Sequence, residues 1–208
     1  MAGTATVKAG ALVLAAVILL LHALPYANAA LTQVTVTLND PNGLPPPGPP
    51  FSFSDTVSVG PGKEIFAGNA TNIGSSNILL NNEYADAQPN NRIVLGLEAG
   101  AGTNTGYGTG ASYLFSNFGF SSLSVVKGVT VSLDNINGVA LGSQVVLGND
   151  SIRVFVDTLT IPAFEAACHG VQCGTITLDL LVSQVPEPVS YAVLAIGLGA
   201  LLIRRRLV

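Results

Sequence analysis

The chain has 208 residues, of which 10% are charged and 49% hydrophobic, and its formal net charge is −4. Soluble domains are typically ~25% charged, so this composition excludes a chain that charge repulsion keeps unfolded. Eight basic residues are also too few for the dense positive surface of a nucleic-acid-binding protein, and no nucleic-acid partner is expected. The composition therefore indicates a folded body with strongly apolar segments.

The N-terminus has the parts of a secretory signal peptide over residues 1–29. Lys8 supplies the positive charge, residues 9–21 form an apolar run, and Ala27-Asn28-Ala29 matches the small-residue cleavage pattern. This predicts cleavage between Ala29 and Ala30. A retained membrane anchor is the alternative, but the run is shorter than the ~20 residues that a spanning helix needs. We therefore expect the body of the protein to be exported.

The body, residues 30–184, shows the two-residue alternation of half-buried β-strands. Residues 31–38 place Val34, Val36 and Leu38 between polar neighbours, and residues 51–59 alternate almost strictly. Turns rich in Gly, Asn and Pro separate the runs, and one helical turn is expected at 162–167. The fold class predicted is all-β, an antiparallel jelly-roll-like β-sandwich of about ten short strands. The expected strands are 31–38, 51–59, 77–80, 92–97, 112–118, 123–126, 129–133, 139–147, 152–157 and 175–182.

Acidic residues outnumber basic ones in the body by eleven to four. Two carboxyl pairs, Glu83 with Asp86 and Asp55 with Glu64, could serve a glycosidase, which needs an acid and a base or nucleophile. Solvated loop acids are the simpler interpretation. The body has a single histidine, His169, on which any Ser-His-Asp triad would depend. We therefore do not expect an enzyme.

Cys168 and Cys173 are the only cysteines of the chain. An even number of cysteines in an exported protein predicts a disulfide. A metal site that uses His169 with the two cysteines is the alternative, but it offers three ligands and not the spacing of a zinc finger. The disulfide is therefore the prediction, and no metal is expected at this position.

Other ligands have weaker support. Calcium is the alternative to no cofactor, because residues 134–138 and 149–150 supply oxygen ligands in loops, although such sequences are ordinary turns. The glycine-rich segment 100–106 lacks the lysine that a phosphate-binding loop requires. Sugar-binding platforms use exposed aromatic rings, and the chain has no tryptophan. Tyr107 is the candidate for such a platform.

The C-terminal tail, residues 185–208, contains three elements in a fixed order. Val185-Pro186-Glu187-Pro188 is followed by an uncharged apolar run, residues 189–203, and then by Arg204-Arg205-Arg206. The run predicts one hydrophobic helix that lodges the precursor in the inner membrane. The arginines are expected to stay in the cytoplasm and stop transfer. The two prolines predict a stiff, extended segment before the helix, a form that proteases bind.

This tail resembles the PEP-CTERM sorting signal of Gram-negative bacteria. The resemblance covers about the last 24 residues and implies that an exosortase-type enzyme recognises Pro-Glu-Pro and removes the tail. Membrane attachment would then be transient, and the body would reach the cell envelope, the outer surface or the medium. The family's occurrence in producers of exopolysaccharide implies a non-enzymatic surface or matrix protein associated with exopolysaccharide or a biofilm. The alternative is a carbohydrate-binding module or a polysaccharide-active enzyme of the envelope.

Overall fold

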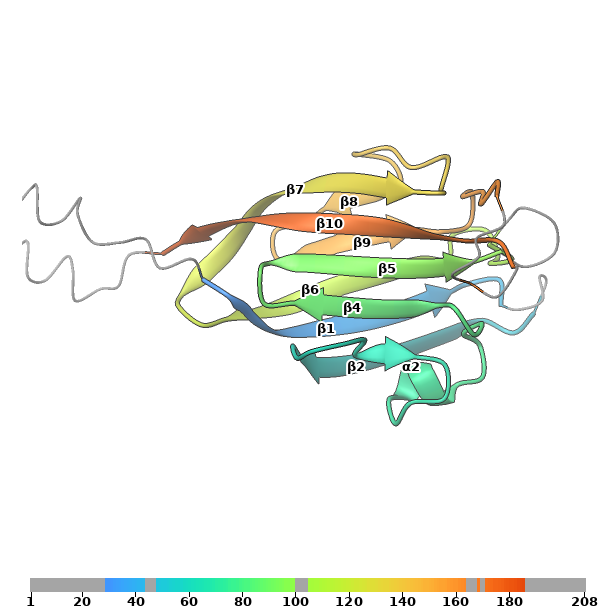
Figure 1. Cartoon of the computed structure of the whole chain (residues 1–208), viewed down its shortest axis with the longest axis horizontal. Helices are drawn as coiled ribbons and strands as arrows, with labels where there is room; N and C mark the ends of the chain where they lie inside the picture. Colours follow the sequence, from blue (N-terminus) through green and yellow to red (C-terminus); the bar gives the residue numbers. More distant parts are fainter. Residues whose placement is uncertain (1–28, 44–47, 100–104, 164–167, 169–170, 186–208) are drawn as a thin grey trace, which may run out of the picture. The chain divides into compact units, whose positions relative to one another are not determined.

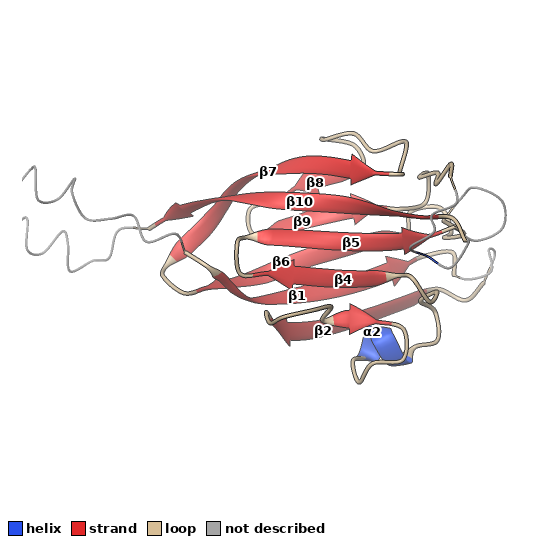
Figure 2. Cartoon of the chain, viewed as in Figure 1, coloured by secondary structure: helices blue, strands red, loops and turns tan. Residues whose placement is uncertain are grey.

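Alternating polar and apolar residues form strands across most of the described chain. The computed structural model describes residues 29–43, 48–99, 105–163, 168 and 171–185, of which Ala29–Ser183 belong to one compact unit. Strands far outweigh the single short helix (Figure 2), which confirms the all-β fold. The elements are β1 (Leu31–Asp40), β2 (Phe51–Ser58), β3 (Ile65–Phe66), α2 (Asn72–Ser75), β4 (Tyr84–Gln88), β5 (Arg92–Glu98), β6 (Ser112–Phe120), β7 (Ser124–Asp134), β8 (Val145–Leu147), β9 (Ser151–Phe155) and β10 (Cys173–Gln184).

The strands form two five-stranded sheets that face each other. Sheet A has the order β2-β1-β6-β9-β8, and sheet B, nearer the viewer in Figure 1, has the order β3-β4-β5-β10-β7. One apolar cluster fills the space between the sheets, as expected for a β-sandwich. The largest fully buried side chains in it are Tyr113, Phe115, Leu31, Leu38, Ile65, Ile73, Ile93, Leu95, Leu97, Ile152, Leu159 and Ile161.

Strand β1 shows how the sequence pattern determines which side chains face the core and which face outward. Val34, Val36 and Leu38 are buried, whereas the threonines between them face outward. At Thr32 and Gln33 two exposed residues follow each other, and the pairing of β1 with β6 shifts register there. A β-bulge of this kind returns the following residues to the inner face. The alternation predicted for residues 34–38 is thus confirmed.

The segment between β2 and β5 differs from the prediction. Residues 77–80 form no strand, and Asn77 has a left-handed φ of 58°. Residues 60–76, for which no strand or helix was predicted, contain β3 and α2. The helix forms because the Thr71 side chain accepts from Gly74 N at 2.8 Å and Asp55 accepts from two further backbone amides of the first turn.

Strand boundaries also differ from the prediction in the second half of the chain. The runs 123–126 and 129–133 belong to one continuous strand, β7, whose alternation shifts by one residue at Gly128. Of the predicted strand 139–147, only β8, Val145–Leu147, pairs with β9. The signal peptide, most of the helical turn at 162–167 and the C-terminal helix lie outside the described residues. Among the described residues, no helix combines the length and apolarity needed to cross a bilayer.

Candidate functional site

Loops from both sheets meet at one end of the sandwich. We call this the loop end and define it by residues 40–43, 80–83, 98–99, 105–111, 134–137, 156–163, 168 and 171–173 (Figure 1). Backbone bonds join these segments, such as Val156 N to Ala111 O at 3.0 Å and Ala99 N to Gln172 O at 2.8 Å. Loops at one end of a rigid sandwich are a common place for binding residues, so this end was the first candidate for a site.

Asp40 joins two of these loops from a fully buried position. Its Oδ1 accepts from the backbone amides of Asn42 and Gly43, each at 2.9 Å, and its Oδ2 accepts from Gly108 N at 2.9 Å. A Cβ at Gly108 would lie 2.7 Å from Asp40 Oδ1, so only glycine permits this close approach. With both oxygens occupied by backbone donors, Asp40 holds the loops together.

Glu83 lies inside the loop end beside two tyrosines. The side chain is 1% exposed, and its Oε2 accepts from Leu80 N at 2.9 Å and from Tyr107 Oη at 3.1 Å. Tyr107 Oη also lies 3.2 Å from Tyr113 Oη, and the two rings meet edge to face. Glu83 Oε1 has no hydrogen-bond partner among the described residues. A carboxyl group therefore sits in the core with one oxygen bonded and one not.

Burial determines the protonation of this cluster. Loss of solvation raises the pKa of Glu83 from 4.5 to about 8, although the amide of Leu80 and the hydroxyl of Tyr107 oppose the change. Burial, followed by the nearby Glu83 carboxyl, also raises the pKa of Tyr107 and that of Tyr113. At pH 7 Glu83 is therefore mainly a neutral acid, as expected for a carboxyl without an ion partner in an apolar interior.

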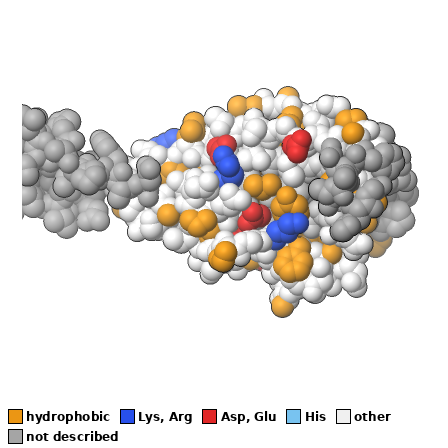
Figure 3. All heavy atoms as spheres, in the orientation of Figure 1, with side chains coloured by type: hydrophobic (Ala, Val, Ile, Leu, Met, Phe, Trp, Pro, Cys, Tyr) orange, Lys and Arg blue, Asp and Glu red, His pale blue; other side chains and the backbone are white. Residues whose placement is uncertain are grey.

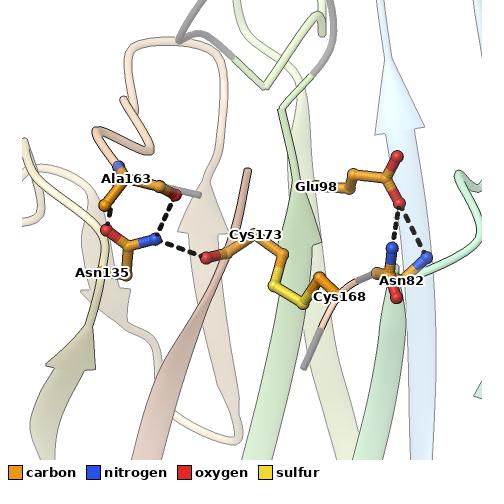
Figure 4. The surroundings of a disulfide bond; sticks show 6 residues. All are labelled: Asn82, Glu98, Asn135, Ala163, Cys168 and Cys173. Carbon is orange, nitrogen blue, oxygen red and sulfur yellow. Dashed lines mark hydrogen bonds between the residues drawn. A yellow bond between two sulfur atoms is a disulfide. The ribbon is translucent and has the colours of Figure 1, made fainter. Parts of the chain in front are cut away.

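The disulfide predicted from sequence is present between Cys168 and Cys173, whose Cα atoms are 6.3 Å apart. Figure 4 shows amide side chains on either side of it. Asn135 donates to the carbonyl oxygens of Ala163 and Cys173 at 2.8 and 2.7 Å, and Asn82 donates to Glu98 through both its backbone and side chain. The disulfide and Asn135 hold the start of β10, and Asn82 joins the residues before β4 to the end of β5.

Replacing both cysteines with serine is expected to lower the free energy of unfolding by about 2 kcal/mol, because the closed loop is short. Urea denaturation of the wild-type and double-variant proteins measures this difference. Iodoacetamide labelling supplies a second check, since a bridged pair reacts only after reduction. Labelling of both cysteines in unreduced, denatured protein would contradict the assignment.

The carboxyl pairs proposed for a glycosidase are not brought together. Glu83 points into the core, whereas Asp86 lies on the outer face of β4. Asp55 accepts from the amides of Asn72 and Ile73, and Glu64 accepts from backbone amides on two other segments. The interpretation of these acids as solvated loop residues is therefore wrong for Glu83, Asp55 and Glu64, which have structural bonding partners.

The calcium hypothesis receives no support from the positions of its residues. Segment 134–138 lies at the loop end, where Asn135 and Asn137 bond to neighbouring backbone groups. Segment 149–150 precedes β9 and lies at the other end of this strand (Figure 1). In the described part of the chain, no three His, Cys, Asp or Glu side chains gather as a metal site. His169 lies outside the described residues.

The prediction that Tyr107 forms an exposed aromatic platform is wrong, because its side chain is buried and bonded to Glu83. Tyr84 is the tyrosine on the outer face of sheet B. Its ring lies over Gly96 of the neighbouring strand, and a Cβ at Gly96 would collide with it. In the sequence, Tyr84, Asp86 and Gln88 alternate with two alanines. This two-residue period is the signal that could have identified a strand with these three side chains on its outer face.

The outer face of sheet A has a different chemistry. Hydroxyl groups pair across its strands, with Thr35 2.8 Å from Thr56 and Thr37 2.9 Å from Ser54. Asn117 donates to the Thr35 hydroxyl at 3.3 Å. This sheet therefore presents small uncharged hydrogen-bonding groups to solvent.

The predicted processing residues lie at the borders of the described chain. Ala30 N donates to Ser121 Oγ at 2.9 Å, and Ala29 is buried. Val185 is the last described residue, so Ala27, Pro186-Glu187-Pro188 and Arg204-Arg205-Arg206 all lie outside the described ranges. No protein-family model, curated protein or solved structure matches the chain.

Proposed function

We propose that this chain is a non-enzymatic exported protein that is sorted to the cell envelope and associates there with exopolysaccharide or a biofilm matrix. The observation that carries the proposal is the disulfide-bonded sandwich, in a sequence whose N-terminal segment has the pattern of an export signal and whose C-terminal segment resembles a sorting signal. Disulfides persist in oxidising compartments outside the cytoplasm. The precursor is held in the inner membrane by the apolar tail, and the processed body is displayed on or released from the envelope.

Processing is proposed at both borders of the body. Signal peptidase removes residues 1–29, and an exosortase-type enzyme acts at Pro186-Glu187-Pro188. The described sandwich supports these positions, because β1 begins at Leu31 and β10 ends at Gln184. The tripeptide follows the last strand by one residue in the sequence. We also propose a jelly-roll-like topology, supported by the repeated passage of the chain between the two sheets.

The non-enzymatic character is supported by the roles that three acids have in the sandwich. Asp40, Asp55 and Glu64 each accept hydrogen bonds from two or three backbone amides. A general acid or nucleophile must instead reach its substrate. A carbohydrate-binding module is the second candidate, and the half-buried ring of Tyr84 on the outer face of sheet B, with its polar neighbours, favours it over a polysaccharide-active enzyme.

The sorting proposal predicts that Glu187→Ala accumulates at full length in the inner membrane, because the recognition tripeptide loses its only charge. Cell fractionation followed by immunoblotting with an antibody against the body measures the full-length and processed forms. Ser190→Ala is the matched control, since it lies in the same tail and leaves the tripeptide intact. Normal processing and display of Glu187→Ala would show that the sorting proposal is wrong.

A further inference from the structure

A shallow depression opens beside β4 on the outer side of the sandwich. Its volume is about 400 Å³, and its lining includes the turn that follows β2 and the hairpin turn between β4 and β5. Figure 3 views the outer face of sheet B, where a few charged side chains stand among hydrophobic and uncharged ones. The lining residues are Gly60, Pro61, Gly62, Asp86, Gln88, Pro89 and Asn90.

Asp86 lines this depression, and one of its carboxyl oxygens has no hydrogen-bond partner among the described residues. Its Oδ2 accepts from Gln88 Nε2 at 2.8 Å, whereas its Oδ1 is shielded from solvent and has no hydrogen-bond partner there. A shielded acceptor without a donor costs free energy. A ligand that brings a hydroxyl or amine to Asp86 would remove this cost after a small movement of the side chain.

An aromatic ring and a cationic side chain adjoin the residues that line the depression. Tyr84 stands two residues before Asp86 on the same face of β4, and Lys63 Nζ lies 3.6 Å from the centre of its ring. Lys63 is exposed, so its long side chain can move away or donate to a ligand. Across sheet B, Asp86 of β4 pairs with Val94 of β5, which in turn pairs with Thr177 of β10.

The lining favours one chemical class of ligand. Its carboxyl and amide groups suit a ligand with several hydroxyls, and Pro61 and Pro89 supply apolar surface for the C–H face of a ring. No basic residue lines the depression, which disfavours an anion. The ammonium of Lys63, beside the Tyr84 ring, disfavours a second cation nearby.

We propose that this depression binds a sugar unit of a neutral polysaccharide, with Asp86 and Gln88 accepting or donating hydrogen bonds to ring hydroxyls and Tyr84 contacting the next unit. The inference rests on the proposed association with polysaccharide and names the residues that make it. Because a depression open to solvent leaves both ends of a sugar free, it fits a unit within a chain as well as a terminal one.

Affinity electrophoresis of the full-length chain tests this inference. Native gels contain dextran, galactomannan or xyloglucan as neutral probes, alginate as an anionic probe and chitosan oligomers as a cationic one. The detergent is a polyoxyethylene ether, so that no sugar headgroup competes. At least one neutral polysaccharide is expected to retard the wild-type protein. Asp86→Asn and Tyr84→Ala are each expected to weaken that retardation about ten-fold, the loss of one good hydrogen bond or stacking contact.

Asp150→Asn is the matched control, because it removes an exposed carboxyl away from the depression and is expected to bind like wild type. The inference is wrong if no neutral probe retards the wild-type protein or if only alginate or chitosan does. It is also wrong if both site variants keep wild-type retardation. Such a failure would not contradict the sorting proposal, because the Glu187→Ala experiment measures processing of the tail and does not depend on sugar binding.

Discussion

Replacing Glu83 with glutamine is expected to remove most of a pH dependence of stability that the wild-type protein shows between about pH 4.5 and pH 8. Glutamine has the shape of the neutral acid and can still accept from Leu80 N, as Glu83 Oε2 does at 2.9 Å. It cannot ionise, so the variant keeps a neutral group in the core at every pH. Among the carboxyl groups, the effect of replacing Glu83 is expected to be the largest, because Glu83 has the largest resolved pKa change of these groups.

The direction follows from the raised pKa of Glu83, about 8 in the folded chain against 4.5 when it is solvated. Below pH 4.5 both the folded and the unfolded chain hold the proton, and the wild-type protein has its full stability. As the pH rises through this window, the unfolded chain loses the proton first, so the folded state is progressively disfavoured. The total loss is up to about 5 kcal/mol at 1.36 kcal/mol for each unit of pKa change.

Urea unfolding of wild type and Glu83→Gln at several pH values from 4 to 9 measures this effect. The difference in the free energy of unfolding between the two proteins is expected to grow in favour of the variant as the pH rises and to level off above pH 8. Other groups titrate equally in both proteins and cancel in the difference. A difference that stays constant across the range would show that Glu83 is not held neutral by burial.

Replacing Asp40 with alanine is expected to lower the free energy of unfolding by about 3 to 5 kcal/mol, because three backbone amides, two of them buried, lose their acceptor at once. These amides belong to Asn42, Gly43 and Gly108, each 2.9 Å from a carboxyl oxygen. The segments after β1 and before β6 then lose one of the contacts that join them, and the bond from Asn42 Nδ2 to Thr109 O remains. The melting temperature is expected to fall by about 10 °C.

Thermal and urea denaturation of Asp40→Ala measure this loss, with Asp134→Ala as the control. Asp134 is exposed at the end of β7, so its replacement is expected to change stability by less than about 0.5 kcal/mol. Equal stability of the two variants would mean that water or other groups replace Asp40 without cost. That result would contradict the role assigned to Asp40 at the loop end.

Strands with β-branched and aromatic residues could be predicted from sequence alone. Residues 31–38, 92–97 and 175–182 lie in β1, β5 and β10, because each alternates around a fully buried apolar face. Strand β4 was not predicted, since its inner residues are Ala85 and Ala87, which have little preference for strands. Its position becomes clear only through pairing with β5 across a three-residue turn in which Asn91 has a positive φ of 63°.

The disulfide was predictable because the chain has only two cysteines. The roles of the acids were not, since a carboxyl in a polar sequence gives no sign of whether it points inward. Glu83 follows two asparagines yet is buried, because the chain turns into the core just before β4. The burial of Tyr107 was missed for the same reason: burial depends on tertiary packing, and a glycine-rich neighbourhood does not indicate it.

The most direct test of the proposed export and sorting is the intact mass of the protein isolated from the cell envelope and the culture medium of cells that express an exosortase. The proposal predicts a chain that begins at Ala30, ends within Val185-Pro186-Glu187-Pro188, and weighs two mass units less before reduction than after it because of the disulfide. A mass that still includes Arg204-Arg205-Arg206 in the surface or released fraction would contradict it.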